Sequence, residues 1–371
     1  MPLYLTEDQV MLRDTARELM ADEGSIANQL RKYRDSGCSD GFGHALWKQM
    51  AELGFTGLRM DEADGGLGLG HVEAGIVLEE IGRNLTPSPF LITAVAVVEA
   101  LRGTPHAKRW FPGILSGDTV AALAVDEGAK HRPEAIAMRA DRAGNGFRLT
   151  GRKQFVVQGA SADLIVVAAR SDEGLTLFAV EKEAKGLDVE GVRLADSSIG
   201  ARLDFQGVEV DSDAVVGEVG QGEAALGRVL NAGRVGAASE MVGLGSAAMG
   251  MTVDYLKQRK QFGRLIGEFQ VLQHRAAHLY SELEIARSAA LKAQQLLDEG
   301  SPEAEAMVAV AKAKAGRAST LAVQEGVQMH GGIGMTDEYD IGLYMKRDRV
   351  LNELFGDPNY HADRLARMKG Y

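Results

Sequence analysis

Short runs of β-branched and aromatic residues fill the stretch from about residue 117 to 220, between two long stretches of helical periodicity. Glycine, aspartate and asparagine bound each run, and turn signals such as Gly144-Asn145-Gly146 separate them. No helical pattern lies between the runs, so β-α-β units are not expected. The stretch predicts a β-barrel or a sandwich, and of these two we expect the barrel.

The two flanking stretches are both helical in pattern. Residues 1–116 open on Thr6, a helix cap that is followed by acidic residues and by apolar residues at helical spacing. Residues 221–371 hold four long helical patterns, and Pro302 stands at the first position of the third. Long antiparallel helices of this kind form a four-helix bundle. The sequence therefore predicts an α+β fold with three domains: an N-terminal α-helical domain (1–116), a middle β-barrel (117–220) and a C-terminal four-helix bundle (221–371).

Charge, cysteine content and hydropathy restrict the expected partners. The formal net charge of -11, from 52 acidic and 41 basic side chains, argues against a broad nucleic-acid-binding face. Cys38 is the only cysteine, so no internal disulfide can form and a reducing cytoplasm is expected. The polar N-terminus lacks the apolar core of a signal peptide, and no later segment approaches the ~20 apolar residues of a membrane span. We expect a cytoplasmic protein with neither a membrane nor a nucleic-acid partner.

Two glycine-containing segments in the C-terminal half could bind a phosphate. The segment QRKQFG (258–263) puts basic side chains at a helix end, ahead of a second helix whose N-terminus favours an anion. Alternatively, Arg259 and Lys260 only complement the C-terminal dipole of their helix. The segment QMHGGIG (328–334) has three glycines after a helix, which lets a ligand approach backbone N–H groups. Ordinary helix termination needs only one of these glycines, so this segment alone is weakly specific.

Taken together, these segments resemble the acyl-CoA dehydrogenase family. The similar stretches are QRKQFGRLIGEFQVLQHRAAHL, QEGVQMHGGIGMTDEY, the N-terminal WKQMAELGFTGLRMDEADGGLGLGH and, in the β region, TGRKQFVVQGASADLIVVAARS. They occur in the family's order across the whole chain. The resemblance implies an FAD enzyme in which a carboxylate takes the α-proton of an acyl-CoA thioester and flavin N5 takes the β-hydride. It also implies a homo- or heterotetramer and an acceptor such as electron-transfer flavoprotein.

The resemblance implies roles for eight cofactor-binding residues. FAD lies between the β domain and the C-terminal bundle in this family, and a neighbouring subunit completes its site. By motif, the residues that match the pyrophosphate and adenine contacts are Arg259, Phe262 and Gln270. The residues that match the loop of the adjoining subunit are Gln328, Gly331 and Gly332. The residues that match the strand beside the isoalloxazine ring are Phe155 and Val157.

Two features depart from the family's flavin-binding pattern. Many relatives end the first strand in a threonine-glutamate-proline-glycine run whose hydroxyl touches the flavin, whereas this chain has VDEG at 125–128. Val157 stands where a threonine is common. Backbone N–H groups can still bind the ring, so these changes affect the tuning of the flavin more than its binding.

The catalytic base is the larger departure. Relatives commonly place a glutamate in the loop after a run such as Arg347-Asp348-Arg349, and here Gly356 occupies that position. Glu353 comes three residues earlier, almost a full helical turn. Asp357 comes one residue later, with a shorter side chain. Alternatively, both carboxylates are ordinary surface groups at a helix end.

Some relatives carry the base on the first bundle helix, at the position that corresponds to Gly233. The nearest carboxylate on that helix face is Glu240, seven residues on or ~10 Å along the axis. Its neighbours on the same helix are small or apolar, and a buried, unpaired carboxylate has a raised pKa that suits a general base. We therefore predict Glu240 as the catalytic residue. Alternatively, Glu240 pairs with a basic residue on another element or lines the end of the acyl pocket.

The ending LFGDPNYHADRLA resembles a branch of the family that acts on bulky or dicarboxylic acyl-CoAs, including the small subunit of pimeloyl-CoA dehydrogenase and steroid side-chain dehydrogenase subunits. One chain of such a pair can lack the base. A non-catalytic partner subunit and an acyl-CoA oxidase are therefore alternative functions. His274 and His278 lie four residues apart, but no acidic or cysteine ligand completes a set nearby, so no metal is expected.

Overall fold

The computed structural model describes residues 3–371, and these form two compact units. The bundle unit holds the chain up to Arg31 together with His71–Thr86 and Arg234–Tyr371. The sheet unit holds Lys32–Gly70 and Pro87–Gly233. The N-terminal helices are thus shared between the two units, and the domain boundaries expected from the sequence remain predictions.

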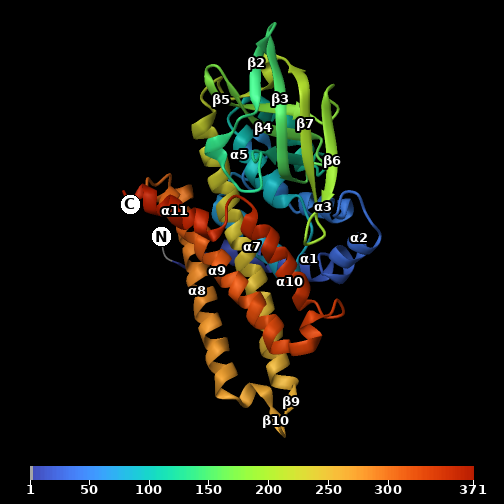
Figure 1. Ribbon diagram of the computed structural model, residues 1–371, viewed down its shortest axis with the longest axis vertical. Helices are drawn as coiled ribbons and strands as arrows, with labels where there is room; N and C mark the ends of the chain where they lie inside the picture. Colours follow the sequence, from blue (N-terminus) through green and yellow to red (C-terminus); the bar gives the residue numbers. More distant parts are fainter. Residues whose placement is uncertain (1–2) are drawn as a thin grey trace. The chain divides into compact units, whose positions relative to one another are not determined.

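The bundle unit consists of long helices (Figure 1). They are α1 (Glu7–Asp22), α4 (His71–Asn84), α7 (Gly222–Gln258, from Arg234 onward), α8 (Gln270–Asp298), α9 (Ala304–His330), α10 (Ile341–Glu353) and α11 (Pro358–Met368). Thr6 caps α1, as predicted, by exchanging hydrogen bonds with Gln9. Helices α4 and α7 cross closely because Gly82 and Gly243 leave no side chain between the two backbones. Among residues 3–371, none of the helices is long and apolar enough to cross a membrane.

Helix α11 is a feature that the sequence pattern did not predict. The sequence places Glu353 and Asp357 at a helix end, and no further helix was predicted after it. In the structure α10 ends at Glu353, and Asp357 and Pro358 start the next helix. Asp357 caps α11 by accepting hydrogen bonds from the backbone N–H groups of Asn359 and Tyr360. Pro358 takes the first helical position, where its missing N–H costs nothing.

The sheet unit combines short helices with one sheet. Its helices are α2 (Lys32–Asp35), α3 (His44–Glu52), α5 (Val98–Leu101) and α6 (Pro105–Leu115). Its strands are β1 (Ala121–Ala124), β2 (Arg139–Ala143), β3 (Gly146–Val157), β4 (Leu164–Ser171), β5 (Gly174–Glu181), β6 (Leu187–Arg193), β7 (Ile199–Val210) and β8 (Val215–Val216). Thr93, in the helical segment before α5, exchanges two hydrogen bonds with the backbone of Ala121 and so fixes β1 against that segment.

The predicted barrel is wrong, because the sheet does not close. The strands follow the order β6-β7-β3-β2-β4-β5-β8, and β1 pairs with β4. Within residues 3–371, no pairing joins β6 to β8 at the two ends of this path. Closure depends on the pairing of the edge strands, and alternation within single strands carries no information about it.

Strand β3 carries the most irregular backbone in the sheet. Its register against β7 shifts between Lys153 and Val156. At this bulge Phe155 has φ 53°, and Gln158 follows at φ 58°. Both values lie in the left-handed region, which side chains with a Cβ adopt only where the surrounding structure enforces it. Strained backbone of this kind concentrates at ligand-binding sites.

Candidate functional site

The turn between α7 and α8 exposes the first group of predicted flavin-binding residues. It forms a small hairpin from β9 (Lys260–Gln261) and β10 (Arg264–Leu265), and Phe262 stands between these strands with φ 53°. Phe262 is 92% exposed, and its ring lies nearly perpendicular to that of Phe269 at 6.2 Å between ring centroids. Arg259 and Gln270 are exposed on either side of the hairpin. An aromatic ring and a guanidinium are thus both open to a ligand from outside this chain.

The end of α9 carries the second group. Gln328 is exposed in the last turn, and Gly331 follows the helix with φ 64°. A Cβ built on Gly331 or on Gly332 would have no atom within 4 Å, so the space beside both glycines is open. A ring contact stabilises the helix end, since the centroid of the His330 ring lies 4.5 Å from that of Tyr255.

These two groups lie at the same end of the bundle unit. A small apolar cluster joins them, in which Leu256 at the end of α7 and Ile266 before α8 pack with Met329 in α9. The structure thus brings together Arg259, Phe262, Gln270, Gln328, Gly331 and Gly332 at this end. The remaining two predicted residues, Phe155 and Val157, lie in the sheet unit.

Phe155 and Val157 lie at and just after the β3 bulge. Phe155 is half-buried, whereas Val157 is buried and pairs with Gly200 in β7. The bulge turns the Phe155 side chain out of the regular alternation of the strand. Phe155 can therefore face a ligand. The resemblance implies that this ligand is the flavin ring.

The loop with the VDEG sequence is pinned by a buried lysine. Lys153 is fully buried and donates hydrogen bonds from Nζ to the Val125 carbonyl (2.9 Å) and to Glu127 Oε1 (2.7 Å). Burial lowers the pKa of Lys153, and Glu127 opposes that shift. Burial acts to raise the pKa of Glu127, but Lys153 and two backbone N–H donors outweigh it and the net shift is downward. Glu127 is therefore a charged structural anchor of the loop.

The residues present fit FAD at its phosphate end. Arg259 supplies a guanidinium for the pyrophosphate, and Phe262 supplies a ring on which an aromatic base can stack. The open left-handed turn at Gly331 lets a ligand approach the backbone without meeting a side chain.

The turn between α10 and α11 has no room for the expected catalytic side chain. Gly356 adopts φ 104°, which disfavours any residue with a Cβ. A Cβ built there would lie 2.4 Å from Cδ1 of Tyr360 and 3.1 Å from Nε2 of His361. A glutamate at position 356 therefore requires a different conformation of this turn.

Three basic side chains hold this turn by its carbonyl groups. Arg234 Nε (3.3 Å) and His361 Nε2 (3.1 Å) both donate to the Phe355 carbonyl. Lys312 Nζ donates to the carbonyls of Gly356 (3.1 Å), Leu351 (2.9 Å) and Asn352 (3.4 Å).

Burial of these basic groups changes how they titrate. It lowers the pKa of Arg234 to about 10 and that of Lys312 to about 7. Burial, with the positive charges of Lys312 and Arg234 next, lowers the pKa of His361 to about 2, so this imidazole stays neutral. Sequence patterns had not indicated Lys312 or His361. For Lys312 the available signal was its place in AVAKAKAG, a run of small residues that is typical of a helix packed closely against others.

Each candidate catalytic carboxylate has an ionic or capping partner. Glu353 pairs with Arg349 one turn earlier at 3.0 Å, and Asp357 caps α11. Glu240 is 2% exposed and accepts hydrogen bonds from Arg347 Nη2 (2.6 Å) and Nε (2.8 Å). For Glu240 the structure thus shows the alternative arrangement, in which a basic residue on another helix pairs with the carboxylate.

Comparison with known proteins identifies the family. Three family models match: Acyl-CoA dehydrogenase, N-terminal domain over residues 6–118, middle domain over 122–208 and C-terminal domain over 220–369. Isovaleryl-CoA dehydrogenase, mitochondrial, from Solanum tuberosum is 33% identical over 326 residues, covering 83% of this chain and 78% of that protein. Short/branched chain specific acyl-CoA dehydrogenase from Bos taurus is 28% identical over 384 residues, covering 99% of this chain and 87% of that protein.

Solved structures agree in fold. A structure titled as a variant of the "Tcur3481-Tcur3483 steroid ACAD" superposes with a TM-score of 0.90 at 29% identity, covering 98% of each chain. The chain belongs to the acyl-CoA dehydrogenase family. It is therefore an oxidoreductase of a family that depends on FAD and acts on acyl-CoA thioesters.

Proposed function

We propose that this protein carries out the α,β-dehydrogenation of a bulky or dicarboxylic acyl-CoA. The observation that carries the proposal is the pairing of family membership with a phosphate-end site that is ready for FAD: an exposed Phe262, an exposed Arg259 and open space at Gly331. The bulky substrate class rests on the similarity to a structure that is titled a steroid ACAD. The two sequences are 29% identical, so the nature of the acyl group is a more specific proposal than the dehydrogenation itself.

This chain's residues bind and orient the cofactor and the substrate in the proposed reaction. Arg259 neutralises pyrophosphate charge, and Phe262 stacks on the adenine end. Gln328 and the Gly331-Gly332 turn bind a cofactor shared with a neighbouring subunit. Phe155 and Val157 border the flavin ring. Bound FAD supplies the acceptor for the β-hydride of the acyl group.

The α-proton needs a base, and Glu240 is the residue that we propose for it. Its burial keeps competing water away, which suits a proton transfer from carbon. Its ion pair with Arg347 stabilises the charged carboxylate and so weakens it as a base. Proton abstraction by Glu240 therefore requires that Arg347 release the reacting oxygen when substrate binds.

A second candidate function is that of a partner subunit whose base comes from a different chain. The observation in its favour is that Glu240, Glu353 and Asp357 are all held by other groups. Gly356 in addition has no room for a side chain in its present turn. The protein would then contribute FAD-binding segments to a heteromeric dehydrogenase.

We also propose a cytoplasmic location, a homo- or heterotetramer and an electron-transfer flavoprotein as acceptor. Two observations support the acceptor and the assembly. A structure titled "Electron transferring flavoprotein of Acidaminococcus fermentans" superposes with a TM-score of 0.90 at 27% identity, over the whole of both chains. In the bundle unit, no atom lies within 4 Å of the Cβ positions of Gly331 and Gly332, so this turn has room for a further partner.

Anaerobic flavin bleaching tests both functions. The chain is purified alone, its FAD absorbance is recorded and a panel of branched, dicarboxylic and steroid acyl-CoAs is added without oxygen. Bleaching that is lost in Glu240→Gln and kept in Glu353→Gln supports dehydrogenation with Glu240 as the base. Bound flavin that no substrate bleaches until a second chain is added supports the partner-subunit function. Loss in Glu353→Gln with retention in Glu240→Gln contradicts the assignment of the base.

A further inference from the structure

A cavity of about 390 Å³ lies in the bundle unit, and its lining includes neither the turn at Gly356 nor the turn at Gly331. Helices α1, α4, α7 and α8 line it together with the N-terminal segment 3–5. Ligand pockets for small molecules start at about 300 Å³. The family's reaction, as proposed above, assigns no role to this cavity.

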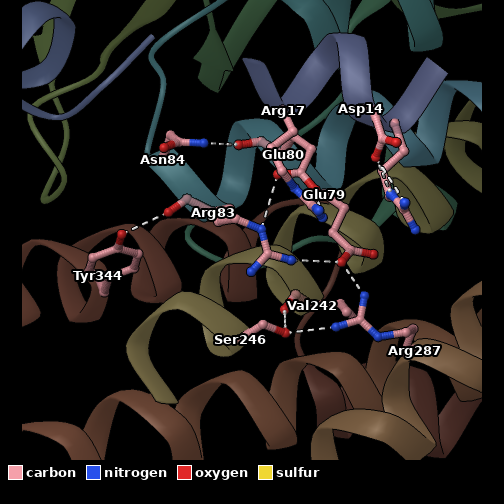
Figure 2. Close-up of polar contacts among 11 residues, drawn as sticks. Asp14, Arg17, Glu79, Glu80, Arg83, Asn84, Val242, Ser246, Arg287 and Tyr344 are labelled. Atoms are coloured by element: carbon pink, nitrogen blue, oxygen red, sulfur yellow. Dashed lines mark hydrogen bonds and ion pairs between the residues drawn. The ribbon is translucent and has the colours of Figure 1, made fainter. Parts of the chain in front are cut away.

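One wall of the cavity is a network of arginines and glutamates (Figure 2). Glu80, on α4, is 1% exposed at its side chain and accepts from Arg17 (2.9 Å) and Arg83 (3.0 Å). Glu79, one residue earlier, pairs with Arg83 (3.2 Å) and with Arg287 of α8. Figure 2 shows these side chains converging from three helices.

The arginines of this wall use only part of their N–H donors. Arg13, Arg17, Arg83 and Arg287 line the cavity with Glu79 and Glu80, and Asp14 and Glu284 balance the charges of Arg13 and Arg287. A guanidinium has five N–H donors. Among residues 3–371, Arg17 bonds one protein acceptor, Glu80, and Arg83 bonds two, one on each glutamate. Arg17 stays 47% exposed and Arg83 30% exposed, so donors face the cavity and the solvent.

Much of the remaining lining is apolar. Its apolar side chains are Leu3, Leu5, Val72, Ile76, Val242, Ala290 and Leu291. Ser239 and Gln294 also line the cavity, and Gln294 Nε2 donates a hydrogen bond to Ser239 Oγ at 2.6 Å, so a ligand need not satisfy these two atoms. Leu3 and Tyr4 are 53% and 72% exposed at the N-terminal side, where a bound apolar group would cover them.

We propose that this cavity is a second binding site, for a small monocarboxylate with an apolar tail. The carboxylate binds the spare N–H groups of Arg17 and Arg83, since planar guanidinium groups match a carboxylate. The tail lies against Val72, Ile76 and Leu291. This site goes beyond the proposed dehydrogenation, because none of its residues belongs to the flavin or base assignments.

Calorimetric titration of the FAD-loaded protein with sodium octanoate tests the proposal. We expect a dissociation constant of about 1 mM or tighter, in line with the affinity per atom of small ligands. Octanamide, which lacks the charge, and acetate, which lacks the tail, should each bind about 10-fold more weakly. Equal binding of octanoate and octanamide, or no binding of octanoate at all, overturns the proposal.

Two variants test whether octanoate binds in this cavity. Arg17→Gln removes one carboxylate partner while Arg83 still neutralises Glu80, so the fold is kept and affinity should fall about 10-fold. Leu291→Trp fills the apolar side and should abolish binding with the arginines intact. Arg367→Gln, an exposed arginine of α11 paired with Asp363, is the matched control and should bind like wild type.

Thermal unfolding without ligand shows whether each variant is folded, and FAD content shows whether the flavin site is intact. Octanoate binding that survives unchanged in folded Arg17→Gln and Leu291→Trp overturns the assignment of the site. Octanoate binding is measured whether or not the wild-type protein dehydrogenates any acyl-CoA, so each of the two proposals can fail without the other.

Discussion

Two fully buried lysines each pin a loop of this protein, one in the sheet unit and one in the bundle unit. Lys153 has a carboxylate partner, Glu127, and one carbonyl acceptor. Lys312 donates to three carbonyls at the end of α10 and at Gly356, and among residues 3–371 none of its hydrogen bonds reaches a carboxylate. Burial lowers the pKa of both, to about 7 for Lys312. Glu127 thus opposes the loss of the proton from Lys153, whereas Lys312 is close to losing its proton at neutral pH.

The difference bears on the two departures from the family's pattern. At 125–128, where the resemblance leads one to expect a hydroxyl, the loop is held by hydrogen bonds from Lys153 to Val125 and Glu127. The turn at 354–357 has lost its usual glutamate, and its carbonyls are held by Arg234, Lys312 and His361. We infer that the second loop is built around glycine and basic side chains, and that adding a carboxylate there would disturb it.

The largest effect is expected for Gly356→Glu. Backbone strain at φ 104° costs about 1–3 kcal/mol, and the contact with Tyr360 adds about 1–3 kcal/mol of overpacking. The free energy of unfolding, measured in urea, should fall by about 3–4 kcal/mol. Gly227→Glu is the control, since Gly227 lies within α7 with no atom near its Cβ position, and it should keep or gain stability. Equal stability of the two variants contradicts the account of the turn.

Lys153→Met should be the next most damaging change. It leaves Glu127, half-buried beside the sheet, without its cation, and such orphaned charges cost about 3 kcal/mol. The double variant Lys153→Met/Glu127→Gln removes the orphaned charge and should recover part of the loss. A double variant no more stable than the single one would show that the pair does not act as a unit.

Lys312 should show a pH dependence that its mutation to methionine removes. Its pKa is about 7 in the folded chain and near 10.5 when unfolded, so the unfolded chain binds more protons between these values. The stability of wild type relative to Lys312→Met should therefore rise from pH 7 to pH 10.5, by at most about 1.4 kcal/mol per pH unit. Urea unfolding at several pH values measures the rise. The groups that face Lys312 are Asp348 and Glu353 of α10, Asp357 at the start of α11 and Arg234 of α7.

The smallest effect is expected for Glu353→Gln. The pair of Glu353 with Arg349 is a helical pair whose arginine is 71% exposed, so its loss should cost about 0.5 kcal/mol or less. A loss above about 2 kcal/mol in urea unfolding would show that Glu353 has a buried structural role that this pair does not describe.

Local patterns predicted the elements well and the contacts between them poorly. The Thr6 cap and the helices of the C-terminal bundle follow from residues close in sequence. The open sheet, the Arg347 partner of Glu240 and the carbonyl acceptors of Lys312 do not. Glu240 and Arg347 are 107 positions apart, and Lys312 lies 39 to 44 positions from its acceptors. Periodicity within one element carries no signal for such pairings.

The most direct test of FAD binding compares two glycines in the bundle unit. Gly331 and Gly300 both adopt left-handed φ (64° and 62°), and neither has an atom within 4 Å of its Cβ position. Gly331 has ψ -138°, in a backbone region that residues with a Cβ avoid, so the flavin content of the two variants is compared per folded chain. Only Gly331→Leu would fill the space that the flavin-binding turn needs. FAD absorbance per folded chain should fall by most of its wild-type value in Gly331→Leu and stay unchanged in Gly300→Leu, and equal flavin content in the two variants would contradict the account.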